Sequence, residues 1–321
     1  MMKSIKTYST LLFLLASLSL FAQYTDVINS NRPGASRSAY SVGTNVIQFE
    51  AGPYILKEKH SPLNYEISGF GVDFSARYGL LWEPLEINIE GTYQNDTYTD
   101  NRSAIPSEDK RANFKFLALG AKYLVYDPYK NAEEDKPNLY SWNANHKFNW
   151  KDLIPAVSVY LGANYDTKNN PYTVPGVEGF SPKVMVASQN NFASGWVFVI
   201  NLIKDRIGTD YSEFQYILTL TKAINQSIVI FGETQGIKND YYGDNLFRVG
   251  GAYLWGKDFQ LDTALTFNTK DTPSVFSVNF GVSYRLDFHK DKEVDNGTDA
   301  KDEGQRRSNR ANSGRKQQNF D

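Results

Sequence analysis

The sequence predicts an all-β protein, a transmembrane antiparallel β-barrel of about 12 strands with a disordered C-terminal tail. Three observations lead to this prediction. Apolar and polar residues alternate with a period of two over segments of about ten residues, which is the length that a tilted strand needs to cross a bilayer. Tight connections alternate with longer polar ones. Beyond the N-terminal leader, no apolar run is long enough for a transmembrane helix.

The composition excludes several classes of protein. The chain has 321 residues, a formal net charge of −2, no cysteine and only 3 histidines. A charge balance so close to zero gives no reason to expect nucleic acid as a partner. The lack of cysteine excludes disulfide scaffolds, thiolate metal sites and cysteine nucleophiles. Aromatic residues make up 14% and the mean hydropathy is −0.48, as expected when apolar and polar strand faces are averaged.

The N-terminus has the pattern of a secretory signal peptide. Lys3 and Lys6 precede an apolar stretch from Leu11 to Phe21, and cleavage is expected after Ala22. The stretch is too short to span a bilayer as a helix. We therefore assign residues 1–22 to the signal peptide and predict the outer membrane of a Gram-negative bacterium as the location.

Alternation defines the expected strands. It is clearest over residues 67–80, where Phe70, Val72 and Phe74 alternate with small or charged residues. Other strands are expected at 45–56, 85–94, 114–126, 155–165, 183–190, 195–204, 212–222, 226–236, 246–255, 259–268 and 276–288. A soluble β-sandwich is the alternative, but its strands usually run about 5–6 residues, and the clearest strands here are longer.

The expected connections fall into two groups. Those after the second, sixth, eighth and tenth strands are tight, at 82–84, 191–194, 223–225 and 256–257. Longer polar connections are expected at 95–111, 166–182, 205–211 and 237–245. Short turns at one end and long loops at the other are typical of outer-membrane barrels. Residues 127–152 break this rule, as an insertion or as a sign that one strand pair is miscounted.

The expected organisation has four parts. The signal peptide is followed by a periplasmic N-terminal segment at 23–43, the outer-membrane barrel at 44–288 and a disordered charged tail at 289–321. Gly281, Tyr284 and Leu286, followed by Phe288, resemble the terminal-strand signal read by the barrel-assembly machinery. The tail is acidic in its first half and basic in its second, as expected for a solvated segment.

Several short motifs, in order along the chain, resemble one family. They are Asn31-Arg32-Pro33-Gly34, Gln48-Phe49-Glu50-Ala51-Gly52, Leu119–Tyr123, Glu233, Gln260-Leu261-Asp262 and Gly281–Arg285. Together they resemble the outer-membrane transporter family named for the meta-pathway of phenol degradation, and the leader resembles Bacteroidetes usage. The family usually has Asp where this chain has Asn31, which argues against a salt-bridge role there. The resemblance implies a β-barrel in the outer membrane and a transport function.

Strand parity predicts the residues that line the lumen. Charged side chains on the lipid face cost about 2–4 kcal/mol each for Lys and Arg at the midplane, so they should point inward. The candidates are Gln48, Glu50, Asp73, Arg77, Glu86, Glu90, Lys122, Arg248, Asp262, Arg285 and Asp287. They form either a salt-bridge network that holds a closed small barrel or a polar constriction that selects solutes. Both roles are compatible.

The motif Asn31, Arg32, Pro33 and Gly34 precedes the first strand. It lies in the periplasm or is tucked into the lumen, as a plain turn or as a small plug. No enzyme activity is expected, because His60, His146 and His289 lie outside the strands, where no rigid element positions them. No cofactor, metal site or phosphate-binding loop is expected either.

The predicted function is that of a transporter or channel for small solutes, hydrophobic or aromatic ones included. A structural or surface-interaction barrel without transport is the alternative, with an outer-membrane enzyme ranked below both. The expected partners are outer-membrane lipid and lipopolysaccharide, the barrel-assembly machinery and an unidentified small solute, with no nucleic acid. Lumen polarity gives no solute identity.

Overall fold

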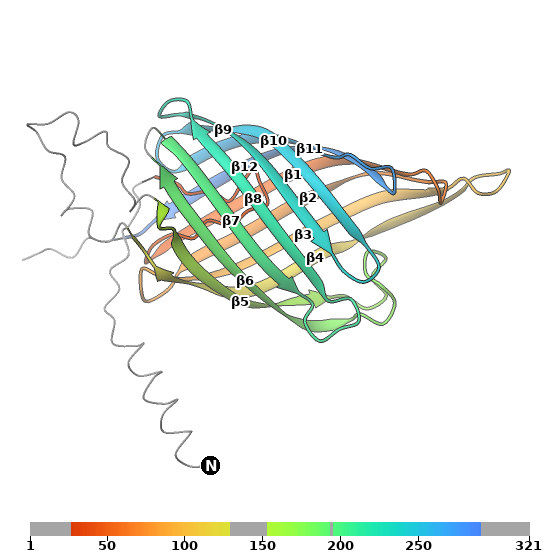
Figure 1. The fold of residues 1–321 in the computed structure, drawn as a ribbon, viewed down its shortest axis with the longest axis horizontal. Helices are drawn as coiled ribbons and strands as arrows, with labels where there is room; N and C mark the ends of the chain where they lie inside the picture. The colour runs from red at the N-terminus through yellow and green to blue at the C-terminus, as the bar shows by residue number, and fades with distance from the viewer. Residues whose placement is uncertain (1–26, 129–152, 193–194, 290–321) are drawn as a thin grey trace, which may run out of the picture. The chain divides into compact units, whose positions relative to one another are not determined.

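The computed structural model describes residues 27–128, 153–192 and 195–289, and its strands form one closed antiparallel barrel (Figure 1). The strands are β1 (Val46–His60), β2 (Tyr65–Gly79), β3 (Leu85–Asp100), β4 (Ser107–Tyr126), β5 (Ala156–Asp166), β6 (Gly179–Phe192), β7 (Trp196–Asp205), β8 (Glu213–Ala223), β9 (Ile228–Lys238), β10 (Gly243–Trp255), β11 (Phe259–Asn268) and β12 (Ser274–Asp287). The prediction of an all-β barrel with twelve strands is confirmed. The signal peptide, the tail beyond residue 289 and most of the 127–152 connection lie outside the described residues.

The barrel closes because the first strand pairs with the last. Gln48 of β1 lies opposite Arg77 of β2 on one side and opposite Arg285 of β12 on the other. Each described strand therefore has two hydrogen-bonded neighbours, and the sheet that these strands form has no open edge. Closure of this kind is what allows a sheet to sit in hydrocarbon, where unpaired backbone groups are costly.

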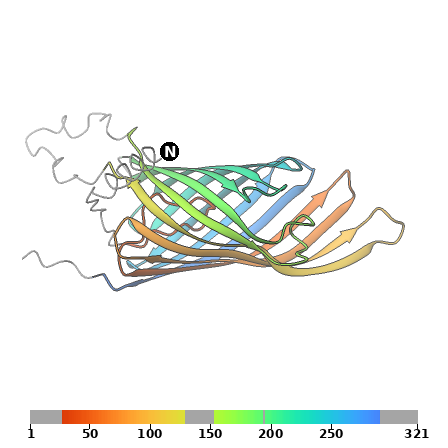
Figure 2. The same ribbon diagram turned by 90° about the horizontal axis from the view of Figure 1, so that it is seen from below.

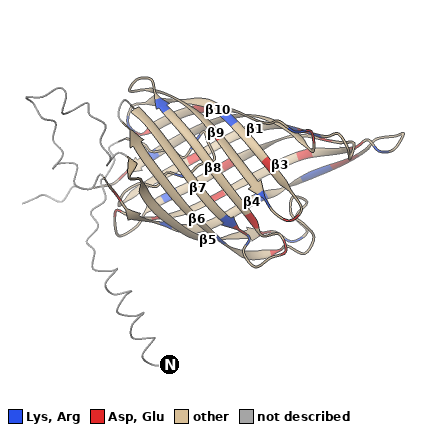
Figure 3. Ribbon diagram, viewed as in Figure 1, with Lys and Arg blue, Asp and Glu red and all other residues tan. Residues whose placement is uncertain are grey.

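The two faces of each strand differ in chemistry, as alternation predicts. On β12, Phe280, Val282 and Tyr284 are exposed on the outside, whereas Ser283 and Arg285 are buried on the inside. Most of the strand surface is uncharged, with charged positions scattered singly along it (Figure 3). Within the described residues, no helix has the length and apolar character needed to cross a membrane.

Both ends of the barrel chain lie at one rim. We call the end where β1 begins and β12 ends the proximal rim, and the opposite end the distal rim. At the distal rim the hairpin of β3 and β4 projects well beyond its neighbours (Figures 1 and 2). The expected long loop at 95–111 is therefore wrong: the loop is only 101–106, and the residues on either side continue the two strands. Likewise, 237–245 is mostly strand.

The connection between β4 and β5 runs from 127 to 155 at the proximal rim, where tight turns otherwise join the strands. Since β4 and β5 pair directly, from Ala118↔Asn164 to Tyr126↔Val157, the strand count is correct on both sides of it. The sequence interpretation as an insertion stands, and a miscounted strand pair is excluded.

A lipid-facing charge tests the assignment of the outer wall. Leu265 lies near the middle of β11 and is 43% exposed on the outside. Leu265→Lys should lower the free energy of unfolding in lipid by about 2–4 kcal/mol. The control is Ile105→Lys. Ile105 is exposed and lies in the distal turn between β3 and β4, outside the strands that cross the membrane. Denaturant titrations in lipid vesicles measure both, and equal effects would contradict the assignment.

Candidate functional site

Residues 27–43 lie inside the barrel, and we call them the luminal segment. Ile28 N–H donates to the Lys257 carbonyl at the proximal rim (2.8 Å), and the Ser30 hydroxyl contacts Ser283 of β12 (2.8 Å). Farther along, Arg37 N–H donates to Asn201 of β7 (2.5 Å). In a ring of twelve strands, β12 and β7 lie on nearly opposite walls. The segment therefore crosses the lumen before it returns to the start of β1.

The motif at 31–34 lies in the lumen, which was one of the two locations that the sequence left open for it. The segment 23–43 was expected to be periplasmic, and only its motif at 31–34 was given the lumen as a second location. The described part of the segment bonds to the inner walls of the barrel, so a periplasmic location is wrong for it. Asn31 stands where the family usually has Asp. Its side-chain oxygen accepts the Ser38 N–H (3.0 Å), which joins two parts of the luminal segment to each other. Asn29 adds a second closing bond to the Ser38 hydroxyl (2.9 Å). These contacts need no charge at position 31.

Arg32 ties the segment to the joint between the first and last strands. Its guanidinium pairs with Asp262 of β11 (3.2 Å) and donates to the Phe280 carbonyl of β12 (3.3 Å). The Gln260 amide donates to the Arg32 carbonyl (3.1 Å). Arginine and carboxylate are both nearly excluded from water here, so the pair is a charge-assisted contact in a low-dielectric setting.

Glu233 of β9 holds the next part of the segment. Its carboxylate accepts the backbone N–H groups of Ala35 (3.0 Å) and Ser36 (3.2 Å) and the hydroxyl of Thr219 (2.7 Å). Arg248 of β10 pairs with the same carboxylate (2.8 Å). Gly34 allows this approach, since a Cβ at that position would lie 2.5 Å from Glu233 Oε2. One wall carboxylate thus satisfies two backbone donors of the segment.

Arg37 reaches a carboxylate on another wall. Its guanidinium contacts Glu90 of β3 (2.5 Å), which also accepts from Lys183 of β6 (3.0 Å). Burial works against charge on Arg37, but the carboxylates of Glu90 and Glu50 outweigh it and raise the pKa of Arg37. The arginine therefore stays charged, and the pair cross-links the segment to two walls.

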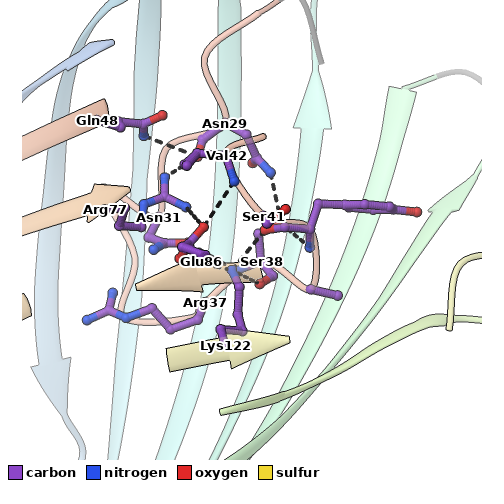
Figure 4. A network of polar contacts seen from close by, with 12 residues as sticks. Asn29, Asn31, Arg37, Ser38, Ser41, Val42, Gln48, Arg77, Glu86 and Lys122 are labelled. Carbon is purple, nitrogen blue, oxygen red and sulfur yellow. Dashed lines mark hydrogen bonds and ion pairs between the residues drawn. The ribbon is translucent and has the colours of Figure 1, made fainter. Parts of the chain in front are cut away.

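A buried cluster of charges surrounds the return of the segment toward β1 (Figure 4). Arg77 lies between Glu50 (2.8 Å) and Glu86 (3.6 Å), and Glu86 also pairs with Lys122 (3.3 Å). The Lys122 ammonium donates to the carbonyls of Ser38 (3.0 Å) and Tyr40 (2.8 Å). The side chains of Arg77, Glu86 and Lys122 are each only 1% exposed. The charged side chains of the lumen thus form ion pairs with one another along the wall and also hydrogen bonds to the luminal segment.

The segment also makes apolar contacts. Ala35 packs against a cluster on the inner wall formed by Tyr160, Met185, Ile203 and Ile217 of β5 to β8. Sequence analysis missed this cluster. Alternation assigns apolar residues to the lipid face, so it gives no signal for an apolar side chain that points into the lumen. It also missed Arg37 of the segment, and the wall residues Asn201, which binds Arg37, and Lys183, which shares Glu90 with it.

The predicted lumen-lining residues occupy the inner face, with one at the rim. Gln48 donates to Glu50 (2.8 Å), and Asp73 accepts from Thr92 (2.7 Å). Arg285 is buried and pairs with Asp287, which is exposed at the proximal rim (2.7 Å). The others belong to the clusters above. His60 is the last residue of β1 at the distal rim, so the expectation that it lies outside the strands is wrong; its Nδ1 accepts the Leu63 N–H (3.1 Å). The described residues contain no cluster of side chains suited to a metal ion.

The fold and its charged lumen define the class of protein: a porin-like β-barrel of the Gram-negative outer membrane. The particular family follows from the sequence. A family model described as "Putative MetA-pathway of phenol degradation" matches residues 30–286, and the chain belongs to that family. The match starts within the luminal segment and ends in β12. No curated protein matches the chain.

Several solved structures are similar to the chain at low sequence identity. An outer-membrane channel from Pseudomonas putida F1 is similar with a TM-score of 0.54 and 8% identity, over 81% of this chain and 100% of that one. The toluene transporter TodX from Pseudomonas putida has a TM-score of 0.44 and 9% identity, over 84% and 95%. The KdgM porin has a TM-score of 0.43 and 10% identity, over 74% and 99%.

Proposed function

We propose that the protein is an outer-membrane channel for small solutes whose lumen is closed at rest by its own luminal segment. One observation carries this proposal: a single short segment bonds to opposite walls, to Ser283 of β12 and to Asn201 of β7, and so lies across the path of any solute. The family description suggests aromatic compounds as a solute class. The apolar cluster around Tyr160 offers such compounds a surface once the segment moves.

The proposal includes the surroundings of the barrel. The outward apolar residues, such as Phe280 and Val282, would contact lipid and lipopolysaccharide. The end of β12 would be read by the barrel-assembly machinery during insertion. A barrel without transport is the alternative, favoured by the same ion pairs if they serve only to brace the wall.

A reversible cross-link tests the proposal. The hydroxyl oxygens of Ser30 and Ser283 are 2.8 Å apart, and the chain has no cysteine, so Ser30→Cys with Ser283→Cys gives one defined disulfide pair. In planar bilayers we expect the oxidised pair to abolish channel openings and a reductant to restore them. Deletion of residues 27–43 should instead give a stable open channel with a clearly larger conductance than wild type.

Controls separate gating from misfolding. Each single cysteine variant should be insensitive to oxidant, and the mobility of unboiled protein on gels reports whether each barrel is folded. Equal conductance in the oxidised, reduced and deletion proteins would contradict the proposal and leave the bracing role. If the deletion variant does not fold, the cross-linked pair alone decides.

A further inference from the structure

Four residues form a row on the inner wall at the joint of the barrel. Asp73 of β2 lies opposite Gly52 of β1, and Asp262 of β11 lies opposite Gly281 of β12. The register of β1 and β12, which pairs Ala51 with Val282 and Tyr54 with Asn279, places Gly52 opposite Gly281. Two glycines therefore lie side by side with an aspartate on either flank. We call this row the glycine slot.

The slot is shaped for a flat cation. A Cβ on Gly52 or on Gly281 would overlap the Arg32 guanidinium, so only glycine lets it lie against both strands. Next to the slot, Pro53 lies opposite Phe280 in the same register and has no N–H to donate. The Phe280 carbonyl accepts from Arg32 instead (3.3 Å). The backbone itself thus supplies an acceptor to the guanidinium.

The slot has more acceptor capacity than Arg32 uses. The Asp262 side chain is 0% exposed, and its Oδ2 oxygen is buried without a hydrogen-bond partner, although Oδ1 pairs with Arg32. Asp73 on the other flank adds a second carboxylate. Arg32 therefore meets the Asp262 carboxylate and the Phe280 carbonyl, and the Asp73 carboxylate lies on the opposite flank of the slot. The slot carries excess negative charge once the arginine leaves.

We propose that the glycine slot is a recognition site for the guanidinium group of a solute. At rest Arg32 fills it as an internal ligand. When the luminal segment is displaced, a solute that carries a guanidinium group binds between Gly52 and Gly281 and pairs with Asp262. The planar fork of such a group matches a carboxylate and a carbonyl at once, which a spherical cation or a bulky ammonium does not. This role rests on the proposed channel function only in that the solute must reach the lumen.

Arg32→Ala empties the slot and makes the test direct. In this variant we expect guanidinium chloride at low, non-denaturing concentration to raise the temperature at which the folded barrel is lost, because a ligand that binds only the native state stabilises it. In bilayers it should also reduce the current, at a concentration about tenfold or more below that needed with tetramethylammonium. The wild type, whose slot is occupied, should show neither effect at that concentration.

Matched variants locate the binding. Arg32→Ala combined with Asp262→Asn, or with Gly281→Ala, should lose the response to guanidinium. Arg32→Ala with Gly232→Ala should keep it, because Gly232 on β9 faces open space and a Cβ there meets nothing within 4 Å. An equal response to guanidinium and tetramethylammonium, or one that survives Asp262→Asn, would overturn the proposal. If no variant conducts, the proposed channel function is contradicted. The thermal measurement then still shows whether the glycine slot binds guanidinium.

Discussion

Arg77→Ala should be the most destabilising single change in the barrel, lowering the free energy of unfolding by about 3–5 kcal/mol. Arg77 is 1% exposed and is the shared partner of Glu50 and Glu86. Its removal takes the shared cation from two buried carboxylates, so Glu86 keeps only its pair with Lys122 and Glu50 loses its ion pair, and an uncompensated buried charge costs more than the lost attraction alone. It also removes one of the two side-chain donors to the Asn29 carbonyl of the luminal segment, the other being the Gln48 amide.

Denaturant unfolding in vesicles, followed by gel mobility, measures this loss. The control is Lys59→Ala, which breaks an ion pair of similar length with Glu66 (2.8 Å) between side chains that are 67% and 51% exposed. A pair so open to water should change stability by at most about 1 kcal/mol. Similar losses in the two variants would show that the Arg77 cluster is not the brace described here. Arg285→Ala tests the same role at the rim.

Glu233→Ala should release the luminal segment and raise the open fraction of the channel by about a hundredfold or more. The carboxylate accepts two backbone N–H groups of the segment, and hydrogen bonds to a charged group contribute about 1.5–3 kcal/mol each. The open state does not make these bonds, so their loss shifts the equilibrium toward it. Single-channel recordings give the open fraction directly.

Two variants separate the segment from the wall. Glu213→Ala removes another buried luminal carboxylate, on β8, whose hydrogen bonds go to Gln215 and Asn239 and not to the segment. It should leave the open fraction near that of wild type. Arg248→Ala removes the wall partner of Glu233 but leaves the carboxylate in place, and its effect should be small. An unchanged open fraction in Glu233→Ala would show that this carboxylate does not hold the segment closed.

The strands could be predicted because the membrane imposes one rule on every one of them. Each crossing must present apolar side chains to lipid and keep charge inside, so parity alone placed Gln48, Glu86 and Arg285 on the inner face. The rule fails where the strands leave the membrane. Residues 95–111 are polar on both faces because the β3–β4 hairpin projects beyond its neighbours, and they therefore resemble a loop in sequence.

The luminal segment was beyond the reach of the same reasoning. Its contacts depend on which walls face each other, and that depends on closure of the barrel. Arg37 meets Glu90 and Asn201 only because β3 and β7 enclose the same space. The motifs of the family resemblance pointed to some of these residues. They include Arg32, Glu233 and Asp262, which form contacts that hold the luminal segment in place.

By itself the sequence determined the number of strands to within one pair, the inward face of the charged side chains and the membrane in which the chain lies, because these follow from local alternation. Only the tertiary structure decided where the N-terminal segment goes and what holds it there. The glycine slot shows the reason. Gly52 and Gly281 are distant in sequence and become neighbours when β1 meets β12, so the site exists only in the closed ring.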